Sequence, residues 1–373
     1  MSAKPESAAR INVATKAIEK NYGHVIKWLG EVAKEERETI STGCIGLDNA
    51  VGRGGLERGL IAEIYGHEGA GKSFLAYSLM MEACKLGHRC AIVDAENSLD
   101  PKLLVSIGLP ADQILVVDGA PTGEANLSIA KSLMETGEFA VVMIDSVAAL
   151  VPEARTEAEF EQQTMGLHAR LLSAGIQKIL PVVKSTNTLL IFINQIRNKI
   201  GAYGNPETTT GGKALPFYAA YRIEVRGGQS QSSKLKDPGT GEVYGHRTTF
   251  KVVKNKRSAP WREAEVDLIY GLGYDTVGEI VDLGVDMGLI DKNGAWFSYG
   301  DQRWQGRDKV KLTIQSDNPL RTELEDKLRR IIAGEFLSED LVEEKSEAKT
   351  DGEKVNDKPA RKKRARKSQE STT

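Results

Sequence analysis

The chain has 373 residues, of which 40% are hydrophobic and 27% charged, so it is long enough for one large domain with smaller attachments. No apolar stretch reaches the length of a membrane span, and the first ten residues lack the apolar region of a secretion signal. The formal net charge of −2 gives no overall positive field, so any nucleic-acid site must be local. Three cysteines without metal-ligand spacing predict reduced thiols in a cytoplasmic protein: Cys44, Cys84 and Cys90.

The N-terminal segment, residues 9–28, carries apolar residues at helical spacing and predicts an amphipathic helix. Two interpretations are open for its apolar face. The helix packs on its own domain, or it docks as an arm on a neighbouring subunit. Spacing alone favours the first.

The most informative motif has the form G-x-x-x-x-G-K-[ST]. It lies between an apolar run at residues 60–65 and a predicted helix at residues 74–86, and this strand–loop–helix context predicts a phosphate-binding loop. Its residues are Gly66, His67, Glu68, Gly69, Ala70, Gly71, Lys72 and Ser73.

Each residue type in this loop has a physical reason. The glycines permit backbone conformations that a Cβ would block, so that N–H groups and the helix N-terminus together form a nest for anions. Lys72 would neutralise charge on the β- and γ-phosphates, and the Ser73 hydroxyl would bind Mg²⁺. A glycine turn that fits the pattern by chance is the alternative, and the flanking strand and helix make it the weaker one.

Strands and helices continue to alternate after this loop. Apolar runs at residues 90–94, 114–117, 140–145 and 188–195 suit strands that are buried on both faces of a parallel sheet. Helices are expected between these runs at residues 123–135 and 165–184, the second interrupted or ended near Pro181. This alternation predicts an α/β fold: a doubly wound, mostly parallel ATPase core.

Beyond Gln195 the pattern breaks. Residues 196–212 are rich in Gly, Asn and Thr and predict a loop that is either functional or disordered. Three more strands are expected at residues 221–225, 248–253 and 265–270, with a flexible hairpin loop at 227–245. The expected domains are an N-terminal helix and linker (1–35), the ATPase core (36–273), a small basic α+β module (274–335) and a disordered charged tail (336–373).

The tail begins acidic and ends in a cluster of Lys and Arg at residues 358–367. Phosphate binding, a localisation signal and simple solubilisation all remain open interpretations of this cluster.

Polar residues at the strand ends complete the predicted nucleotide site. Asp145 follows a buried strand and is placed to bind Mg²⁺, although a helix-capping carboxylate is the alternative. Glu96 is the candidate general base for the attacking water, and Asp94 competes with it on sequence alone. Gln195 directly precedes the irregular loop and would sense the γ-phosphate.

These motifs together identify a family. From residue 9 to residue 333 the chain resembles the bacterial-type RecA recombinases, whether of bacterial or phage origin. The specific segments are Asp94-Ala95-Glu96, Ile144-Asp145-Ser146, Gly204-Asn205-Pro206-Glu207-Thr208-Thr209-Thr210-Gly211-Gly212 and Lys251-Val252-Val253-Lys254-Asn255-Lys256. A phosphate-binding loop alone occurs in many NTPases, whereas this set does not.

The resemblance implies a DNA-dependent ATPase that uses ATP and Mg²⁺, forms a helical homo-oligomeric filament on single-stranded DNA and exchanges strands with a homologous duplex. It further implies a role in DNA repair and the SOS response. It assigns the residues of the phosphate-binding loop, with Phe74 and Asp100, to the nucleotide, Ser73 and Asp145 to the metal, and Lys72, Glu96 and Gln195 to catalysis. Lys254 and Lys256 would reach the ATP of an adjacent subunit, and the N-terminal helix becomes the polymerisation arm.

The resemblance also places two DNA loops, at residues 157–164 and 196–210, and suggests that the C-terminal module admits duplex DNA. Backbone N–H groups, hydroxyls and cations of the loops suit phosphate contacts that do not read sequence. Ile200 and Tyr203 would stack on or wedge between bases. The implied DNA-binding residues are Met165, Arg170, Arg197, Asn198, Lys199, Ile200, Tyr203, Thr208, Thr209, Thr210, Gly211 and Gly212.

Several residues depart from the family pattern. Leu103 stands where an adenine-stacking tyrosine is common, Gln177 replaces an arginine near the DNA path, and Pro216 replaces a polar residue beside Phe217. The second DNA loop is one residue shorter, and the basic tail differs from the usual acidic one. Leu103 and Gln177 keep open a regulatory filament that does not exchange strands, and a ring-forming helicase-like motor, which would share Lys72 and Asp145, is the other alternative.

Overall fold

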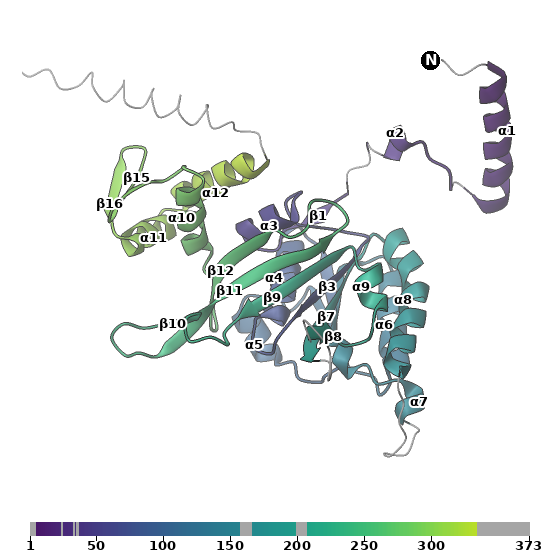
Figure 1. Ribbon diagram of the computed structural model, residues 1–373, viewed down its shortest axis with the longest axis horizontal. Helices are drawn as coiled ribbons and strands as arrows, with labels where there is room; N and C mark the ends of the chain where they lie inside the picture. Colours follow the sequence, from purple (N-terminus) through teal and green to yellow (C-terminus); the bar gives the residue numbers. More distant parts are fainter. Residues whose placement is uncertain are drawn as a thin grey trace, which may run out of the picture. The chain divides into compact units, whose positions relative to one another are not determined.

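The computed structural model describes residues 5–23, 25–32, 34, 37–156, 166–198 and 207–333 (Figure 1). The predictions for the tail and for Met165, Lys199, Ile200 and Tyr203 lie outside these residues. The chain divides into two compact units, Met1–Thr39 and Ile40–Thr373, and each is described by itself. Within the described ranges, no helix is both long enough and apolar enough to cross a membrane.

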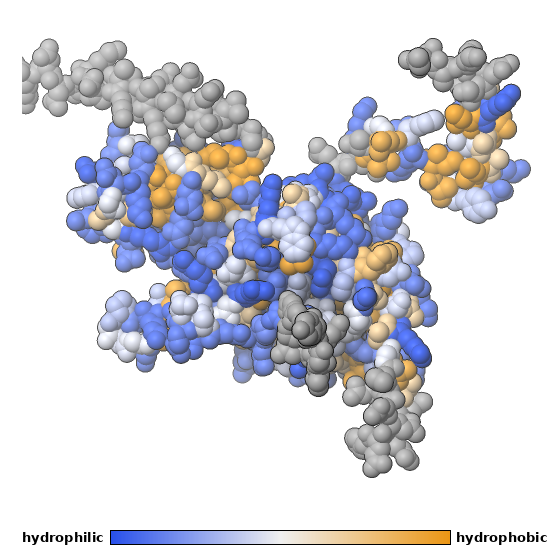
Figure 2. Space-filling view, in the orientation of Figure 1, coloured by the Kyte–Doolittle hydropathy of each residue, from blue (hydrophilic) through white to orange (hydrophobic). Residues whose placement is uncertain are grey.

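The N-terminal unit consists of helix α1 (Pro5–Tyr22) and the short helix α2 (Leu29–Val32). The predicted helix at residues 9–28 therefore ends early, at Tyr22, because Gly23 follows with a φ of +76° that breaks the helical path. Figure 2 shows apolar surface along α1, where Ile11, Val13 and Ile18 are exposed. Helices owe most of their stability to packing of an apolar face, and within this unit the apolar face of α1 is exposed.

The second unit is built on one large sheet with the strand order β13-β12-β11-β9-β3-β7-β6-β4-β5. The strands from β9 to β5 in this order are all parallel, and the others pair antiparallel. The predicted mostly parallel α/β sheet is thus confirmed. The strands are β3 (Ile61–Gly66), β4 (Arg89–Asp94), β5 (Ile114–Asp118), β6 (Phe139–Asp145), β7 (Leu189–Asn198), β9 (Tyr221–Gly227), β11 (Val243–Asn255), β12 (Glu263–Ile269) and β13 (Gly273–Tyr274).

Helices cover both faces of this sheet, as a doubly wound fold requires (Figure 1). On one face, α4 (Lys72–Lys85) shares an apolar core with the strands, and on the other, α6 (Gly123–Glu135), α8 (Leu167–Ser185) and α9 (Ala214–Tyr218) form a second core. Smaller elements are β1 (Thr39–Ile40), β2 (Leu56–Glu57), α3 (Ile45–Val51), α5 (Pro101–Ser106), α7 (Glu153–Thr156) and a 3₁₀ turn at Val147–Ala149.

Three local predictions were wrong. β5 is not buried on both faces, since it is the edge strand, and Leu115 and Val116 are 43% and 38% exposed. Helix α8 runs past Pro181, because its apolar face, including Ile179 and Val183, is buried on both sides of that proline. The segment 227–245 is only partly a loop, because β10 (Lys234–Lys236) pairs there with β11.

Part of the irregular segment 196–212 forms strand. β7 continues to Asn198, and β8 (Glu207–Thr209) returns antiparallel to it, with Arg197 opposite Thr208. Sequence periodicity missed this pairing because the strand is short and made of polar residues.

The C-terminal part of this unit forms a small α+β module. It contains α10 (Thr276–Asp286), β14 (Asp291–Asn293), β15 (Trp296–Tyr299), β16 (Gln302–Gln305), α11 (Arg307–Ser316) and α12 (Asn318–Ala333). Ile45 of α3 inserts into the apolar core of the module, and the buried carboxylate of Glu279 accepts hydrogen bonds from the Ile45 and Gly46 N–H groups. Helix α3 therefore fastens the module to the ATPase core.

Candidate functional site

The phosphate-binding loop connects β3 to α4. Gly66 ends β3, where a Cβ would lie 2.1 Å from the Val225 carbonyl oxygen, so that only glycine fits. Gly71 has a φ of +95° immediately before Lys72 begins the helix. The backbone therefore turns directly into a helix N-terminus, which is the geometry of an anion-binding nest.

Lys72 is buried and bends back over the loop, where its Nζ donates to the His67 carbonyl at 2.7 Å. Burial lowers the pKa of Lys72, while the nearby Asp145, Glu68 and Glu96 carboxylates act in the opposite direction. The ammonium group thus lies over the loop, where a phosphate in the nest would meet it.

The carboxylate of Asp145 meets the Ser73 hydroxyl at the end of β6. Ser73 Oγ donates to Asp145 Oδ2 at 2.8 Å. Burial raises the pKa of Asp145 to about 6, and the Glu96 and Asp94 charges add to this increase, whereas the Ser73 hydrogen bond opposes it. A hydroxyl and a carboxylate are hard oxygen donors, and such pairs hold Mg²⁺ in nucleotide sites with phosphates and waters completing the shell. These residues therefore fit the metal.

No group of three or more His, Cys, Asp or Glu side chains within the described ranges could hold a metal ion alone.

The two acids that compete on sequence for the general-base role differ in their surroundings. Asp94 is buried and accepts a hydrogen bond from the Leu99 N–H at 2.8 Å. Glu96 is exposed, and its Oε1 accepts from the Ser146 hydroxyl and from Gln195 Nε2, the latter at 3.4 Å. The geometry therefore favours Glu96 as the acid that contacts a water in the site, with Ser146 orienting it. Sequence reasoning gave Ser146 no role in the site, although it follows the strand-end Asp145 and belongs to the Ile144-Asp145-Ser146 segment.

Gln195 connects Glu96 to residues 196–210, the segment that the family resemblance predicts as the second DNA loop. Its Oε1 accepts a hydrogen bond from the Arg197 guanidinium at 3.0 Å, two residues further along β7. The preceding Asn194 is buried and donates to the Thr210 carbonyl at 3.0 Å. Both ends of the loop are thereby tied to the strand that carries Gln195.

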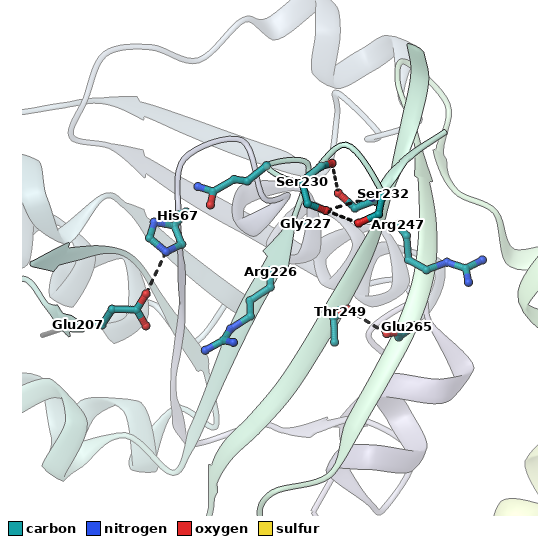
Figure 3. Close-up of a pocket in the computed structure, with 11 residues that line it drawn as sticks. His67, Glu207, Arg226, Gly227, Ser230, Ser232, Arg247, Thr249 and Glu265 are labelled. Carbon is teal, nitrogen blue, oxygen red and sulfur yellow. Dashed lines mark hydrogen bonds and ion pairs between the residues drawn. The ribbon is translucent and has the colours of Figure 1, made fainter. Parts of the chain in front are cut away.

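A second connection joins the phosphate-binding loop to β8. Figure 3 shows the His67 ring facing the Glu207 carboxylate, with Nε2 and Oε1 3.3 Å apart. Both residues line a cavity of about 470 Å³ that also includes Arg226 and the serines that follow β9. His67, predicted as a nucleotide contact, thus also contacts Glu207 of β8, in the segment predicted to contain the second DNA loop.

Of the other predicted DNA-binding residues, Arg170, Gly211 and Gly212 lie at one end of α8. Arg170 is exposed in the first turn of this helix, and Gly212 packs so close that a Cβ would lie 2.8 Å from the Ala169 Cβ. Gly211 packs on Leu172 in the same way, with a φ of +92°. Arg170 and the glycine pair are therefore neighbours. Thr208 and Thr209 lie in β8 and Thr210 follows it, while the side chain of Asn198 is outside the described structure.

Lys254 and Lys256 are not brought to the phosphate-binding loop of their own chain. The Lys254 ammonium donates to the Pro216 and Phe217 carbonyls at 2.7 and 2.9 Å, and Lys256 lies 3.4 Å from the Phe217 carbonyl. Both cations thus cap the C-terminal end of α9, where carbonyls carry negative partial charge. Phe217 is 71% exposed beside them.

Asp100 caps the N-terminus of α5 and accepts hydrogen bonds from the Lys102 and Leu103 N–H groups at 2.9 and 3.4 Å. It lines a cavity of about 180 Å³ that extends from Ser73 and Asp145 to Leu103. Phe74, predicted beside the nucleotide, packs edge-on against Tyr274. Gln177 donates to the Tyr218 hydroxyl at 3.2 Å, and therefore fixes α9 against α8.

This fold and site define an α/β phosphate-loop nucleotide-binding protein. Two family models match the chain: the RecA N-terminal domain over residues 9–275 and the RecA C-terminal domain over residues 278–333. The chain belongs to the RecA family.

Relatives named Protein RecA are similar over most of the chain. The protein of Caulobacter vibrioides is 44% identical over 322 residues, which are 86% of this chain and 88% of that protein. That of Clostridioides difficile is 41% identical over 356 residues, 92% of this chain and all of that protein. That of Chlorobaculum tepidum is 42% identical over 334 residues, 88% and 94% of the two chains. Matches of this extent support a recombinase function of the RecA type and, in general, ATPase activity, nucleotide binding and DNA binding.

Proposed function

We propose that the chain is an ATP-dependent homologous recombinase that acts in the cytoplasm in recombinational DNA repair. It forms a helical filament on single-stranded DNA, pairs this strand with a homologous duplex and exchanges strands. The observation that carries the proposal is the series of contacts from Glu96 through Gln195 to Arg197, because it joins a hydrolytic site to a DNA-binding loop.

The nucleotide end of this series binds ATP through the phosphate-binding loop. Backbone N–H groups of residues 66–73 receive the phosphates, and Lys72 exchanges its His67 carbonyl partner for phosphate oxygens. Ser73 and Asp145 would hold Mg²⁺, which when bound neutralises phosphate charge. Asp100 and Leu103 line the adjoining cavity where the nucleoside fits.

Hydrolysis requires a base for the attacking water, and Glu96 supplies it. Its carboxylate is exposed, and the Ser146 hydroxyl holds it in position. When Glu96 takes the proton of the water, its acceptor bond with Gln195 weakens, because a neutral carboxyl is a poorer acceptor than a carboxylate. Gln195 is then free to follow the γ-phosphate, and it takes Arg197 with it.

The DNA end uses groups that contact phosphates and leave the bases unread. Arg170 and Arg197 supply positive charge, and the residues 208–212 supply hydroxyl and N–H donors. Such contacts suit a filament in which base pairing with the homologous strand provides the specificity. The C-terminal module, with exposed Lys292 and Arg303, is proposed to admit the duplex.

Three features support assembly of identical chains. Helix α1 exposes apolar residues, β5 leaves one edge of the large sheet unpaired within the described structure, and Phe217 is exposed. Lys254 and Lys256 lie beside Phe217. We propose that the neighbouring subunit covers this aromatic ring with the surface around its nucleotide site, so that both cations contact the bound ATP.

The test is phosphate release with and without single-stranded DNA, together with electron microscopy of the chain on single-stranded DNA with a non-hydrolysable ATP analogue. Helical filaments and DNA-stimulated hydrolysis are expected. Hydrolysis that DNA does not stimulate would overturn the proposal, and closed hexameric rings would support a helicase-like motor. Joint molecules formed from homologous DNA would exclude a filament that is only regulatory.

A further inference from the structure

Strand β11 carries two polar residues on the face that should be apolar. Every second residue from 246 to 252 faces the interior: Phe250 and Val252 belong to the main apolar core, and His246 and Thr248 continue the same stripe. His246 is 1% exposed and Thr248 is fully buried. A buried polar side chain destabilises the fold unless it forms a hydrogen bond. His246 and Thr248 are therefore unfavourable at these positions unless they serve another role.

Both residues lie directly beneath the phosphate-binding loop. A Cβ added to Gly71 would lie 3.9 Å from Thr248 Oγ1. A Cβ added to Gly228, directly after β9, would lie 3.6 Å from the His246 ring and 3.2 Å from the Gly69 carbonyl oxygen. The ring and the hydroxyl therefore form part of the floor on which residues 69–71 rest.

Each of the two side chains has a polar atom without a hydrogen-bond partner among the described residues: His246 Nε2 and Thr248 Oγ1. The other ring nitrogen, Nδ1, lies 3.2 Å from the Tyr270 hydroxyl. Burial lowers the pKa of His246. The ring is therefore neutral near pH 7, and when Nδ1 accepts from Tyr270 the hydrogen resides on Nε2.

The geometry of a peptide group links this floor to the ligand. A peptide that points its N–H at a bound phosphate must point its C=O the opposite way, into the floor beneath the loop. Donors in that floor stabilise this orientation, and His246 Nε2–H and the Thr248 hydroxyl are donors of this kind.

We infer that His246 and Thr248 are positioning residues that orient the peptide groups of residues 69–71 toward the polyphosphate of the nucleotide. The inference rests on the proposed nucleotide site and adds to it a second layer of residues. Because the two donors act on loop peptides, they assist the binding of any polyphosphate and not of the nucleoside.

The principal test is Thr248→Val, which removes the hydroxyl at nearly constant volume, with Thr249→Val on the opposite face of β11 as the matched control. Calorimetric titration of the full chain with Mg²⁺ and either ADP or pyrophosphate measures affinity, and urea unfolding without ligand measures stability. Thr248→Val should weaken both ligands by a similar factor, about 5- to 10-fold for one lost hydrogen bond. Its unfolding midpoint should stay equal or rise, because a buried unpaired hydroxyl is gone.

A second pair of variants tests the histidine. His246→Gln keeps an N–H donor near the position of Nε2 and should bind pyrophosphate within about twofold of wild type, whereas His246→Leu should lose affinity as Thr248→Val does.

Unchanged affinity in Thr248→Val would overturn the inference, as would an equal loss in Thr249→Val, a loss for ADP alone, or a loss matched by a lower unfolding midpoint. A wild-type chain that binds neither ADP nor pyrophosphate would refute the proposed nucleotide site itself. If the wild-type chain binds both ligands and the variants bind them with the same affinity, only the positioning role of His246 and Thr248 is refuted.

Discussion

The pKa of Asp145 provides a quantitative prediction for Asp145→Asn. The ordinary aspartate pKa is 3.8, and burial raises that of Asp145 to about 6. The folded chain thus binds the proton more tightly than the unfolded chain. The contribution of this proton to the free energy of unfolding is fully present below pH 3.8 and is lost as the pH rises through 6. Each pKa unit of this increase corresponds to about 1.36 kcal/mol. At pH 8 the ionised carboxylate therefore lowers the free energy of unfolding by about 3 kcal/mol.

Asparagine keeps an acceptor for the Ser73 hydroxyl but carries no charge. Without ligand, Asp145→Asn should therefore be more stable than wild type at pH 8 by up to about 3 kcal/mol, and about half of this difference should disappear by pH 5. A thermal midpoint higher by roughly 5 °C or more at pH 8 is expected. The same variant should lose Mg²⁺-dependent nucleotide binding.

The assay is thermal unfolding of both proteins at pH 5 and pH 8, without nucleotide or Mg²⁺. Asp118→Asn is the matched control, because Asp118 also ends a strand, in register with Asp94, but is exposed. If wild type and Asp145→Asn show the same pH dependence, the buried carboxylate is not the source of the effect, and the reasoning fails.

Three further predictions concern hydrolysis and DNA. Glu96→Gln should slow phosphate release by about 100-fold or more while ATP binding persists, and undiminished turnover would exclude Glu96 as the base. Gln195→Ala should abolish the stimulation of hydrolysis by single-stranded DNA, measured as the ratio of the rates with and without DNA. Lys254→Ala should spare ATP binding by dilute chains yet depress hydrolysis in filaments. An equal loss in both states would disprove a role across the subunit interface.

Local patterns in the sequence were enough to predict much of this protein. Helix α6 has the predicted bounds, Gly123–Glu135, because its apolar residues recur at helical spacing and Thr122 caps its start. The phosphate-binding loop was equally clear, since glycine spacing followed by Lys72 and Ser73 fixes a backbone shape without any distant contact. The family itself followed from such local segments.

The tertiary structure decided what depends on neighbours. β5 is exposed because it lies at the edge of the sheet. Helix α8 continues beyond Pro181 because its apolar residues before and after the proline are buried in the core. Burial, together with the Leu99 contact, set Asp94 apart from Glu96. His246 and Thr248 show most clearly what the sequence alone does not predict. Alternation in the sequence reveals which face of a strand they occupy, but only the folded sheet sets that face beneath the phosphate-binding loop.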